Sequence, residues 1–151
     1  MTDIKPAARH RARELALQAL YQWQLSGYDA TNSEARFRAQ NHMGKADTGY
    51  FHELYKGVTS DPATLDALLE PHIGRPVKDV DAIALCILRM ACWELSERMD
   101  IPYKVALNEA VDLAKRFGAT DAHKFVNGSL DKLAAELRAI EVAAEQSAEQ
   151  S

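Results

Sequence analysis

Apolar side chains recur at intervals of three and four residues along almost the whole chain. This is the spacing of one face of a helix, and no segment alternates between apolar and polar residues over the length of a strand. Several of the helical segments begin at residues suited to a helix N-terminus, such as Pro6, Asp47 and Asp61-Pro62. The expected helices cover residues 6–25, 33–42, 47–58, 61–73, 79–98, 102–117 and 120–137.

The segment 79–98 is apolar almost all round, which is typical of a helix buried in the middle of a bundle. Gly74 and Pro76 interrupt the pattern before it, so a division of the chain is expected near residues 74–78. Beyond about Ile140 the apolar stripe is lost, and the acidic tail 141–151 is expected to fray. The predicted fold class is therefore all-α, with six or seven helices in two small bundles that form one domain of residues 1–140.

Composition excludes several classes of protein. The 151 residues are 47% hydrophobic and 26% charged, the usual balance of a soluble globular protein. The longest apolar run, residues 83–88, is too short to span a bilayer, which takes roughly twenty residues, and no secretory signal is recognisable at the N-terminus. Cys86 and Cys92 are expected on different sides of one helix, where they can form neither a disulfide nor a zinc site. These features predict a cytoplasmic protein without a metal.

Net charge is −4, but positive residues are concentrated at the N-terminal end of the first expected helix. Cations there are unfavourable, by roughly 0.3–1 kcal/mol each, because the helix dipole is already positive. An external anion would reverse this cost, since backbone N–H groups, dipole and side chains would all attract it. Lys5, Arg9 and Arg13 also share one face and could follow a phosphate backbone. The alternative is a solvated basic face with Glu14 among its neighbours.

A second cluster surrounds the junction near Gly118. Lys115, Lys124 and neighbouring cations alternate there with Phe117 and Phe125. Single-stranded nucleic acid is bound by such a combination of positive charge and aromatic rings on which bases stack. The alternative is that both phenylalanines belong to the core, because each lies on an apolar stripe.

Sequence motifs for catalysis or cofactor binding are missing. The chain has no phosphate-binding loop, dinucleotide-binding motif, zinc-protease motif or nucleophile elbow. Arg89 lies in an apolar helix and is expected to pair with Glu94 or with a carboxylate of another helix. These observations favour a binding protein without a cofactor over an enzyme.

Four segments resemble the bacterial transcription antitermination factors of the NusB family. They are residues 5–23 (KPAARHRARELALQALYQW), 87–95 (ILRMACWEL), 101–118 (IPYKVALNEAVDLAKRFG) and 121–132 (DAHKFVNGSLDK). The resemblance covers roughly residues 5–137 and does not include the loop around residues 27–47 or the acidic tail. It implies an all-helical fold of two small bundles and no enzymatic activity.

The resemblance also implies partners. Members of this family bind the boxA element of nascent RNA together with NusE, a small-subunit ribosomal protein, and join RNA polymerase with other Nus factors. Matching the motifs assigns Tyr21 to the contact with NusE. His10 stands where many relatives have arginine, so one phosphate contact is expected to be weaker or pH-dependent. The residues assigned to RNA are Lys5, Arg9, His10, Arg13, Lys115, Phe117, Asp121, Lys124 and Phe125.

Two alternatives stay open from the sequence. One is the NusB-like module found attached to RNA cytosine methyltransferases, which would imply S-adenosylmethionine chemistry elsewhere. The other is a purely structural protein that forms a homodimer through the surface assigned to RNA.

Overall fold

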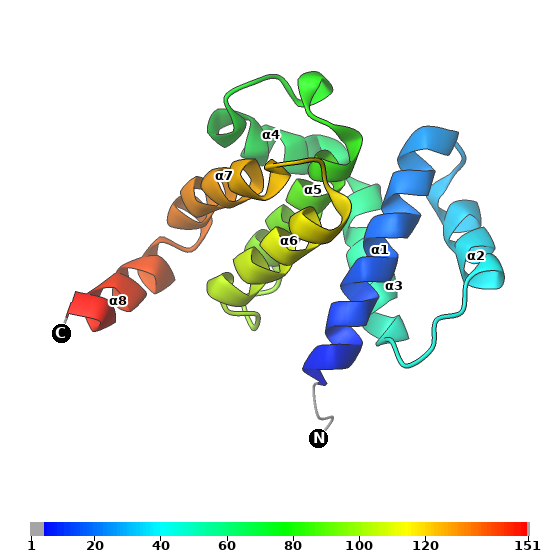
Figure 1. Ribbon diagram of the computed structural model, residues 1–151, viewed down its shortest axis with the longest axis horizontal. Coiled ribbons are helices and arrows are strands. Elements are labelled where there is room, and N and C mark those ends of the chain that lie inside the picture. Colours follow the sequence, from blue (N-terminus) through cyan, green and yellow to red (C-terminus); the bar gives the residue numbers. More distant parts are fainter. Residues whose placement is uncertain (1–4, 151) are drawn as a thin grey trace. The chain divides into compact units, whose positions relative to one another are not determined.

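The computed structural model describes residues 5–150, which form helices and the turns that connect them (Figure 1). Within this range there are eight α-helices, one short 3-10 helix and no strand. The predicted all-α class is therefore confirmed, with one helix more than expected. The chain divides into two compact units, Met1–Pro62 and Ala63–Ser151. This division precedes the expected break at residues 74–78.

Three helices form the first unit: α1 (Pro6–Ser26), α2 (Ala30–Gln40) and α3 (Thr48–Ser60). Helix α1 packs against both others, mainly along α3. Asp29 and Asp47 are the N-caps of α2 and α3, and their carboxylates accept hydrogen bonds from the backbone N–H groups of Asn32 and Tyr50 at 2.9 and 3.0 Å. Since each cap satisfies an otherwise unpaired N–H, the two aspartates fix where the helices begin.

An aromatic core joins α2 to α3. The rings of Phe37 and Phe51 stack at 5.7 Å between centroids, and Phe51 stacks in turn on Tyr55 at 6.1 Å. The Tyr55 hydroxyl donates to the Ala30 carbonyl at 2.9 Å, which gives its buried polar end a partner. This core holds α3, and with it the residues that face α1, in a fixed position.

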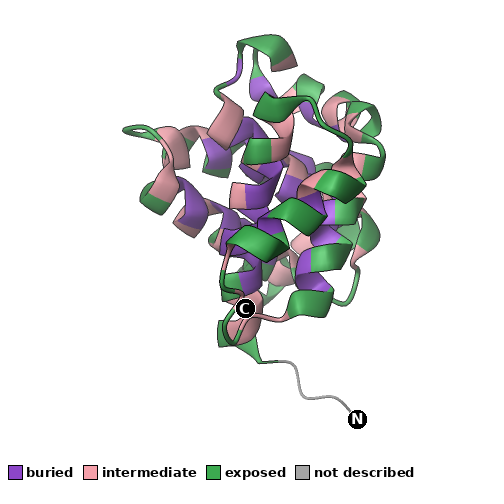
Figure 2. Ribbon diagram, turned by 90° about the vertical axis from the view of Figure 1, so that its right-hand side faces the viewer, coloured by how far each residue is buried: buried purple, intermediate pink, exposed green. Residues whose placement is uncertain are grey.

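The second unit contains α4 (Pro62–Ile73), the 3-10 helix η1 (Val77–Asp79), α5 (Ala82–Glu97), α6 (Tyr103–Phe117), α7 (Ala122–Leu137) and α8 (Ala139–Gln150). Helix α5 packs against α6 and α7, which also pack against each other. Ten residues of α5 are buried, Cys86 and Cys92 among them, which confirms the predicted central helix. In most helices the buried residues lie along one side (Figure 2).

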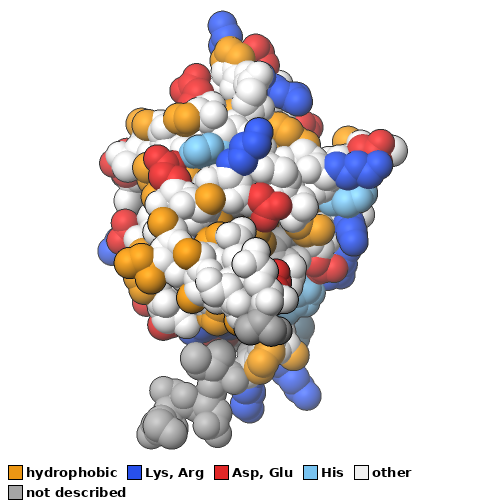
Figure 3. Space-filling model, turned by 90° about the vertical axis from the view of Figure 1, so that its left-hand side faces the viewer, with side chains coloured by type: hydrophobic (Ala, Val, Ile, Leu, Met, Phe, Trp, Pro, Cys, Tyr) orange, Lys and Arg blue, Asp and Glu red, His pale blue; other side chains and the backbone are white. Residues whose placement is uncertain are grey.

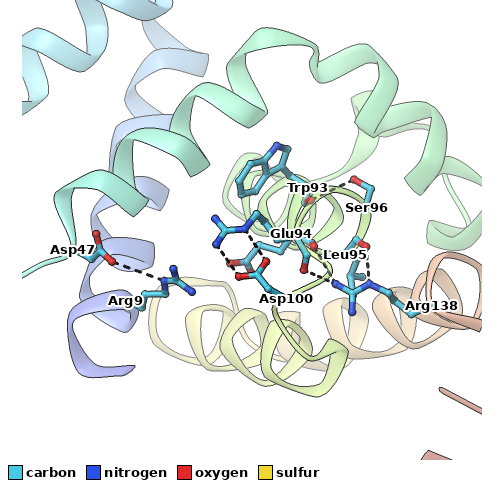
Figure 4. Close-up of polar contacts among 9 residues, drawn as sticks. Arg9, Asp47, Trp93, Glu94, Leu95, Ser96, Asp100 and Arg138 are labelled. Carbon is cyan, nitrogen blue, oxygen red and sulfur yellow. Dashed lines mark hydrogen bonds and ion pairs between the residues drawn. The ribbon is translucent and has the colours of Figure 1, made fainter. Parts of the chain in front are cut away.

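Two largely buried arginine side chains connect helices of the second unit. Arg89 of α5 pairs with Asp66 of α4, so the expected ion pair is made with another helix and not with Glu94. Arg138, which is buried, donates from Nε to the carbonyl of Leu95 and from Nη2 to that of Arg98, both at 2.8 Å (Figure 4). These carbonyls belong to the C-terminal end of α5, where backbone acceptors have no partner within the helix. Arg138 therefore caps the central helix.

The acidic tail after residue 140 lies in helix α8, and its expected fraying stays a prediction. This helix has no buried residue, which is why the apolar pattern does not reveal it. It is held by polar contacts instead: Lys104 Nζ donates to Glu145 at 2.8 Å and to Glu149 at 3.0 Å, and the backbone N–H of Tyr103 donates to Glu141 at 3.0 Å.

On the face drawn in Figure 3, hydrophobic, acidic and basic side chains are intermixed among the described residues.

Candidate nucleic-acid interface

Within residues 5–150, the N-terminal turn of α1 has positive side chains and no acidic residue of its own. Lys5 is the N-cap and provides no side-chain cap, Pro6 occupies the first helical position, and the first turn contains no acidic residue. Lys5 is exposed, and its carbonyl accepts a hydrogen bond from the Arg9 N–H at 3.1 Å. The backbone donors and the dipole of this helix end therefore add to the charge of Lys5, as an anion-binding site requires.

Arg9 is the most confined of the cations in this turn. Its guanidinium lies over the Tyr50 ring, 4.3 Å from the centroid, and its side chain is 15% exposed. Nε is 3.9 Å from Asp47 Oδ2, which is too long for a hydrogen bond, and this buried nitrogen has no hydrogen-bond partner within residues 5–150 (Figure 4). A desolvated, positively charged donor of this kind is suited to an anionic acceptor.

Arg13 follows Arg9 on the same face of α1 but lies in the interior. It is 4% exposed, and its guanidinium is 5.4 Å from the centroid of the same Tyr50 ring. In this conformation Arg13 supports the ring on which Arg9 rests, and its direct contact with RNA stays a prediction. The spacing of Tyr50 along the chain is that of a core residue and gives no sign that two arginines stack on its ring.

His10 lies on a different side of α1, near Glu14. His10 Nε2 and Arg11 Nη1 are 3.9 and 3.7 Å from the Glu14 carboxylate, which is buried. The alternative that the sequence left open, a basic face balanced by Glu14, therefore describes His10 and Arg11. Lys5 and Arg9 lie outside this pairing. Tyr21, further along α1, is half-buried, and its contact with NusE stays a prediction.

A tight backbone turn separates α6 from α7. A Cβ at Gly118 would lie 2.6 Å from the Ala114 carbonyl oxygen, so only glycine fits there. Asp121 is the N-cap of α7, one residue after the expected start of this helix at residue 120, and its side chain makes no cap. Its φ of +65° makes it the single non-glycine residue in the left-handed region within residues 5–150. Asp tolerates this conformation better than most residues, and such strain is common at functional sites.

The side chains at this turn are aromatic and cationic, as predicted. Phe117 and Phe125 are half-buried, so each leaves part of its ring accessible. Lys115 and Lys124 are exposed, and Lys124 Nζ lies 3.4 Å from the Asp121 carboxylate. This exposure fits both roles that the sequence allowed for the phenylalanines, since part of each ring packs inward.

Two further arginines, which the predicted site omits, stack on these rings. Arg75, in the segment between α4 and η1, lies 4.5 Å from the centroid of Phe125, and Arg116 lies 5.4 Å from that of Phe117. Arg75 is exposed and 50 residues distant from Phe125 in sequence, so no local pattern could pair them. Its position adds a cation to the predicted stacking surface.

The nine predicted RNA-binding residues therefore form two groups. Lys5, Arg9, His10 and Arg13 lie on α1 of the first unit, and the other five lie at the α6–α7 turn of the second.

In the part of the chain that the structure describes, no group of three or more His, Cys, Asp or Glu residues could hold a metal ion. Nor is any helix of residues 5–150 long and apolar enough to cross a membrane. The chemistry of the two groups of predicted residues is suited to binding an anion and to stacking on flat rings.

Comparison with known proteins identifies relatives along most of the chain. The transcription antitermination protein NusB of Teredinibacter turnerae is 53% identical over 139 residues, which cover 91% of this chain and 95% of the relative. That of Idiomarina loihiensis is 54% identical over 129 residues, 85% of this chain and 93% of the relative. Both names describe a regulator of transcription, which agrees with the prediction that the chain is not an enzyme.

Solved structures give the same result for the fold. NusB of T. maritima superposes with a TM-score of 0.74 at 26% identity and covers 90% of this chain and 94% of that one. A structure of the antitermination factors NusB and NusE with double-stranded RNA superposes with a TM-score of 0.74 at 22% identity, covering 85% of this chain and 97% of that one. The model of the NusB family matches residues 10–135, and the chain belongs to this family.

Proposed function

We propose that this protein is an RNA-binding transcription antitermination factor that recognises the boxA element of nascent RNA in single-stranded form, together with NusE. The proposal rests mainly on the surroundings of the Arg9 side chain. Its buried Nε lacks an acceptor within residues 5–150, and it lies beside the positive end of α1 on a ring that holds it in place. An RNA phosphate would supply both the acceptor and the negative charge.

The two groups of residues have different tasks in this mechanism. Lys5 and Arg9 bind phosphates and so position the strand without reading its sequence. The rings of Phe117 and Phe125 stack bases, and polar groups of the α6–α7 turn, Asp121 among them, form hydrogen bonds with base edges. Sequence preference for boxA therefore comes from the second unit and most of the salt-dependent affinity from the first.

NusE is proposed as the protein partner, with Tyr21 in its interface. The support is the relationship to NusB proteins, one of which has been solved in complex with NusE and RNA. A factor of this kind acts with RNA polymerase and other Nus factors on ribosomal RNA operons, where it suppresses premature termination, and thus works in the cytoplasm.

The experiment measures binding of boxA RNA and of scrambled RNA, each with and without NusE, by fluorescence anisotropy. Arg9→Gln removes the charge on the Tyr50 ring, and we expect it to weaken binding of both RNAs by the same factor because phosphate contacts are independent of sequence. Lys56→Gln, an equal loss of charge on the exposed side of α3, is the matched control and should bind as the unaltered protein does. Equal affinity of the Arg9 and Lys56 variants would exclude α1 as the RNA site.

A further inference from the structure

The end of the connection between α2 and α3 is hydrogen-bonded to the start of α1. The backbone N–H of Asp47 donates to the Ala8 carbonyl at 3.0 Å, and the Asp47 carboxylate lies 3.9 Å from Arg9 Nε. The guanidinium of Arg9 lies over the ring of Tyr50, which is one turn further along α3. The last residues of this connection therefore lie beside the phosphate site proposed on α1.

Two cations, one on this connection and one near the end of α2, are available to a ligand. Lys45 is exposed, and within residues 5–150 its side chain makes no ion pair or hydrogen bond. Two residues span at most about 7 Å, and Asp47 N is 3.0 Å from the Ala8 carbonyl oxygen, so the Lys45 backbone lies within about 10 Å of that oxygen. This is close to the distance over which charges interact in about 0.1 M salt, roughly 10 Å.

Arg38 is the second of these cations. It extends from α2 toward the start of α3, where Nη2 donates to the Thr48 carbonyl at 3.4 Å and the guanidinium lies over Phe51 at 5.7 Å. Arg38 is exposed, and a guanidinium has five N–H donors, so this single weak bond leaves most of them for other acceptors. These contacts hold the charge at the first turn of α3, whose N-cap is Asp47.

Acidic residues near this surface are few and partly engaged. Glu34, on α2, is buried, and its carboxylate pairs with His52 at 2.8 Å. Asp47 faces Arg9, and Glu53 lies on the second turn of α3. Among the described residues, the four cations Lys5, Arg9, Arg38 and Lys45 outnumber these three carboxylates, in a chain whose net charge is −4.

We propose that Arg38 and Lys45 form a second phosphate-binding arm, which continues the RNA path that begins on α1 along the end of α2 and the α2–α3 connection. The inference rests on the proposed function, since it takes the ligand of α1 to be RNA. It lies in a stretch, residues 27–47, that the family motifs do not include. The arm binds the sugar–phosphate backbone, so it adds affinity to any sequence adjoining the strand on α1.

The test compares two double variants of equal charge. Arg38→Gln with Lys45→Gln removes the arm. Arg36→Gln with Lys56→Gln is the control, because Arg36 lies two residues from Arg38 on α2 and so points about 200° away around the helix. Affinity for RNAs that contain boxA, or a scrambled sequence, with extensions on both sides is measured against salt concentration. Thermal unfolding followed by circular dichroism establishes that both variants are folded.

Each phosphate contact to a single strand contributes about 0.7 to the slope of log affinity against log salt. Loss of the arm should therefore reduce the magnitude of this slope by about 1.4 for both RNAs, and Lys45→Gln alone, which removes no contact within the protein, by about 0.7. The proposed arm is wrong if neither the Arg38→Gln, Lys45→Gln double variant nor Lys45→Gln alone changes the slope, while Arg9→Gln lowers it. That result would leave the proposed function intact. Failure of the unaltered protein to bind RNA would overturn both.

Discussion

Arg89 and Asp66 join α5 to α4 through two parallel hydrogen bonds: Nε donates to Oδ1 and Nη2 to Oδ2, each at 2.8 Å. The side chains are 12% and 21% exposed, so the pair is largely removed from water. A two-point contact of this kind requires the planar guanidinium and cannot be reproduced by lysine. It fixes the position of α4, which has few buried residues of its own.

Removal of one member of this pair should be more damaging than removal of both. Arg89→Met leaves the Asp66 carboxylate partly buried without its counter-charge, and we expect a loss of about 3 kcal/mol in the free energy of unfolding. Combining it with Asp66→Leu removes the stranded charge and should recover much of that loss. Urea unfolding of the two single variants and the double variant gives the coupling energy. Additive losses would contradict the expected coupling.

The backbone at Asp121 predicts a stability order opposite to the usual effect of glycine. At φ +65° a Cβ is unfavourable, so Asp121→Gly should be at least as stable as the original residue, and Asp121→Ala less stable than the glycine variant by about 1 kcal/mol. Thermal unfolding checks this order. Because both variants lack the carboxylate, equal losses of RNA affinity would assign the effect to that group, whereas a loss in the alanine variant alone would assign it to the turn.

Phe125 offers a way to separate a structural role from base stacking. Phe125→Leu keeps most of the apolar volume of a half-buried side chain, so we expect it to cost less than about 1.5 kcal/mol of stability. It removes the aromatic face, and stacking is worth about 1–3 kcal/mol per base, so RNA affinity should fall by roughly 5- to 150-fold. Phe37→Leu, in the aromatic core of the first unit, is the control and should reduce stability without this loss of RNA binding.

Most of the helices could be predicted from the sequence, because they depend on local signals, whereas the RNA-binding roles of both groups of site residues stay predictions. Periodic apolar residues specify which side of a helix is buried, and Asp47 caps α3 as its position before the apolar run indicates. The pairing of Arg89 with Asp66 could not be specified in this way. It depends on how α4 and α5 pack, and the sequence offered several carboxylates.

The features that the sequence did not reveal depend on tertiary or polar contacts. Tyr50 has the spacing of a core residue, which does not show that Arg9 and Arg13 stack on its ring. Arg75 meets Phe125 only once the segment between α4 and η1 lies against α7. Burial of Arg13 also depends on tertiary packing. The spacing of Lys5, Arg9 and Arg13 shows that they share one side of a helix, but not how far each is buried.

The two cysteines should be unreactive in the folded protein. Burial raises the pKa of both Cys86 and Cys92 to about 12, so neither forms the nucleophilic thiolate at neutral pH. A disulfide reagent at pH 8 should modify them only after addition of urea. Since these folded-state pKa values exceed those of the unfolded chain, this contribution to stability is complete below about pH 8.5 and is lost as pH rises toward about 12. Rapid labelling of the native protein would contradict the buried positions.

Helix α8 should depend on one lysine. Hydrogen bonds from Lys104 to Glu145 and Glu149 raise the pKa of this amine, so it is fully charged at neutral pH, and no apolar residue of α8 is buried to hold the helix in its place. We expect Lys104→Gln to speed amide hydrogen exchange in residues 142–150 while exchange in α5 stays slow, and high salt to have the same effect on the unaltered protein because exposed ion pairs are screened. Lys132→Gln, an equal change of charge on α7, is the control. Slow exchange of α8 in the Lys104 variant would mean that the Tyr103–Glu141 and Arg138–Glu141 contacts alone suffice.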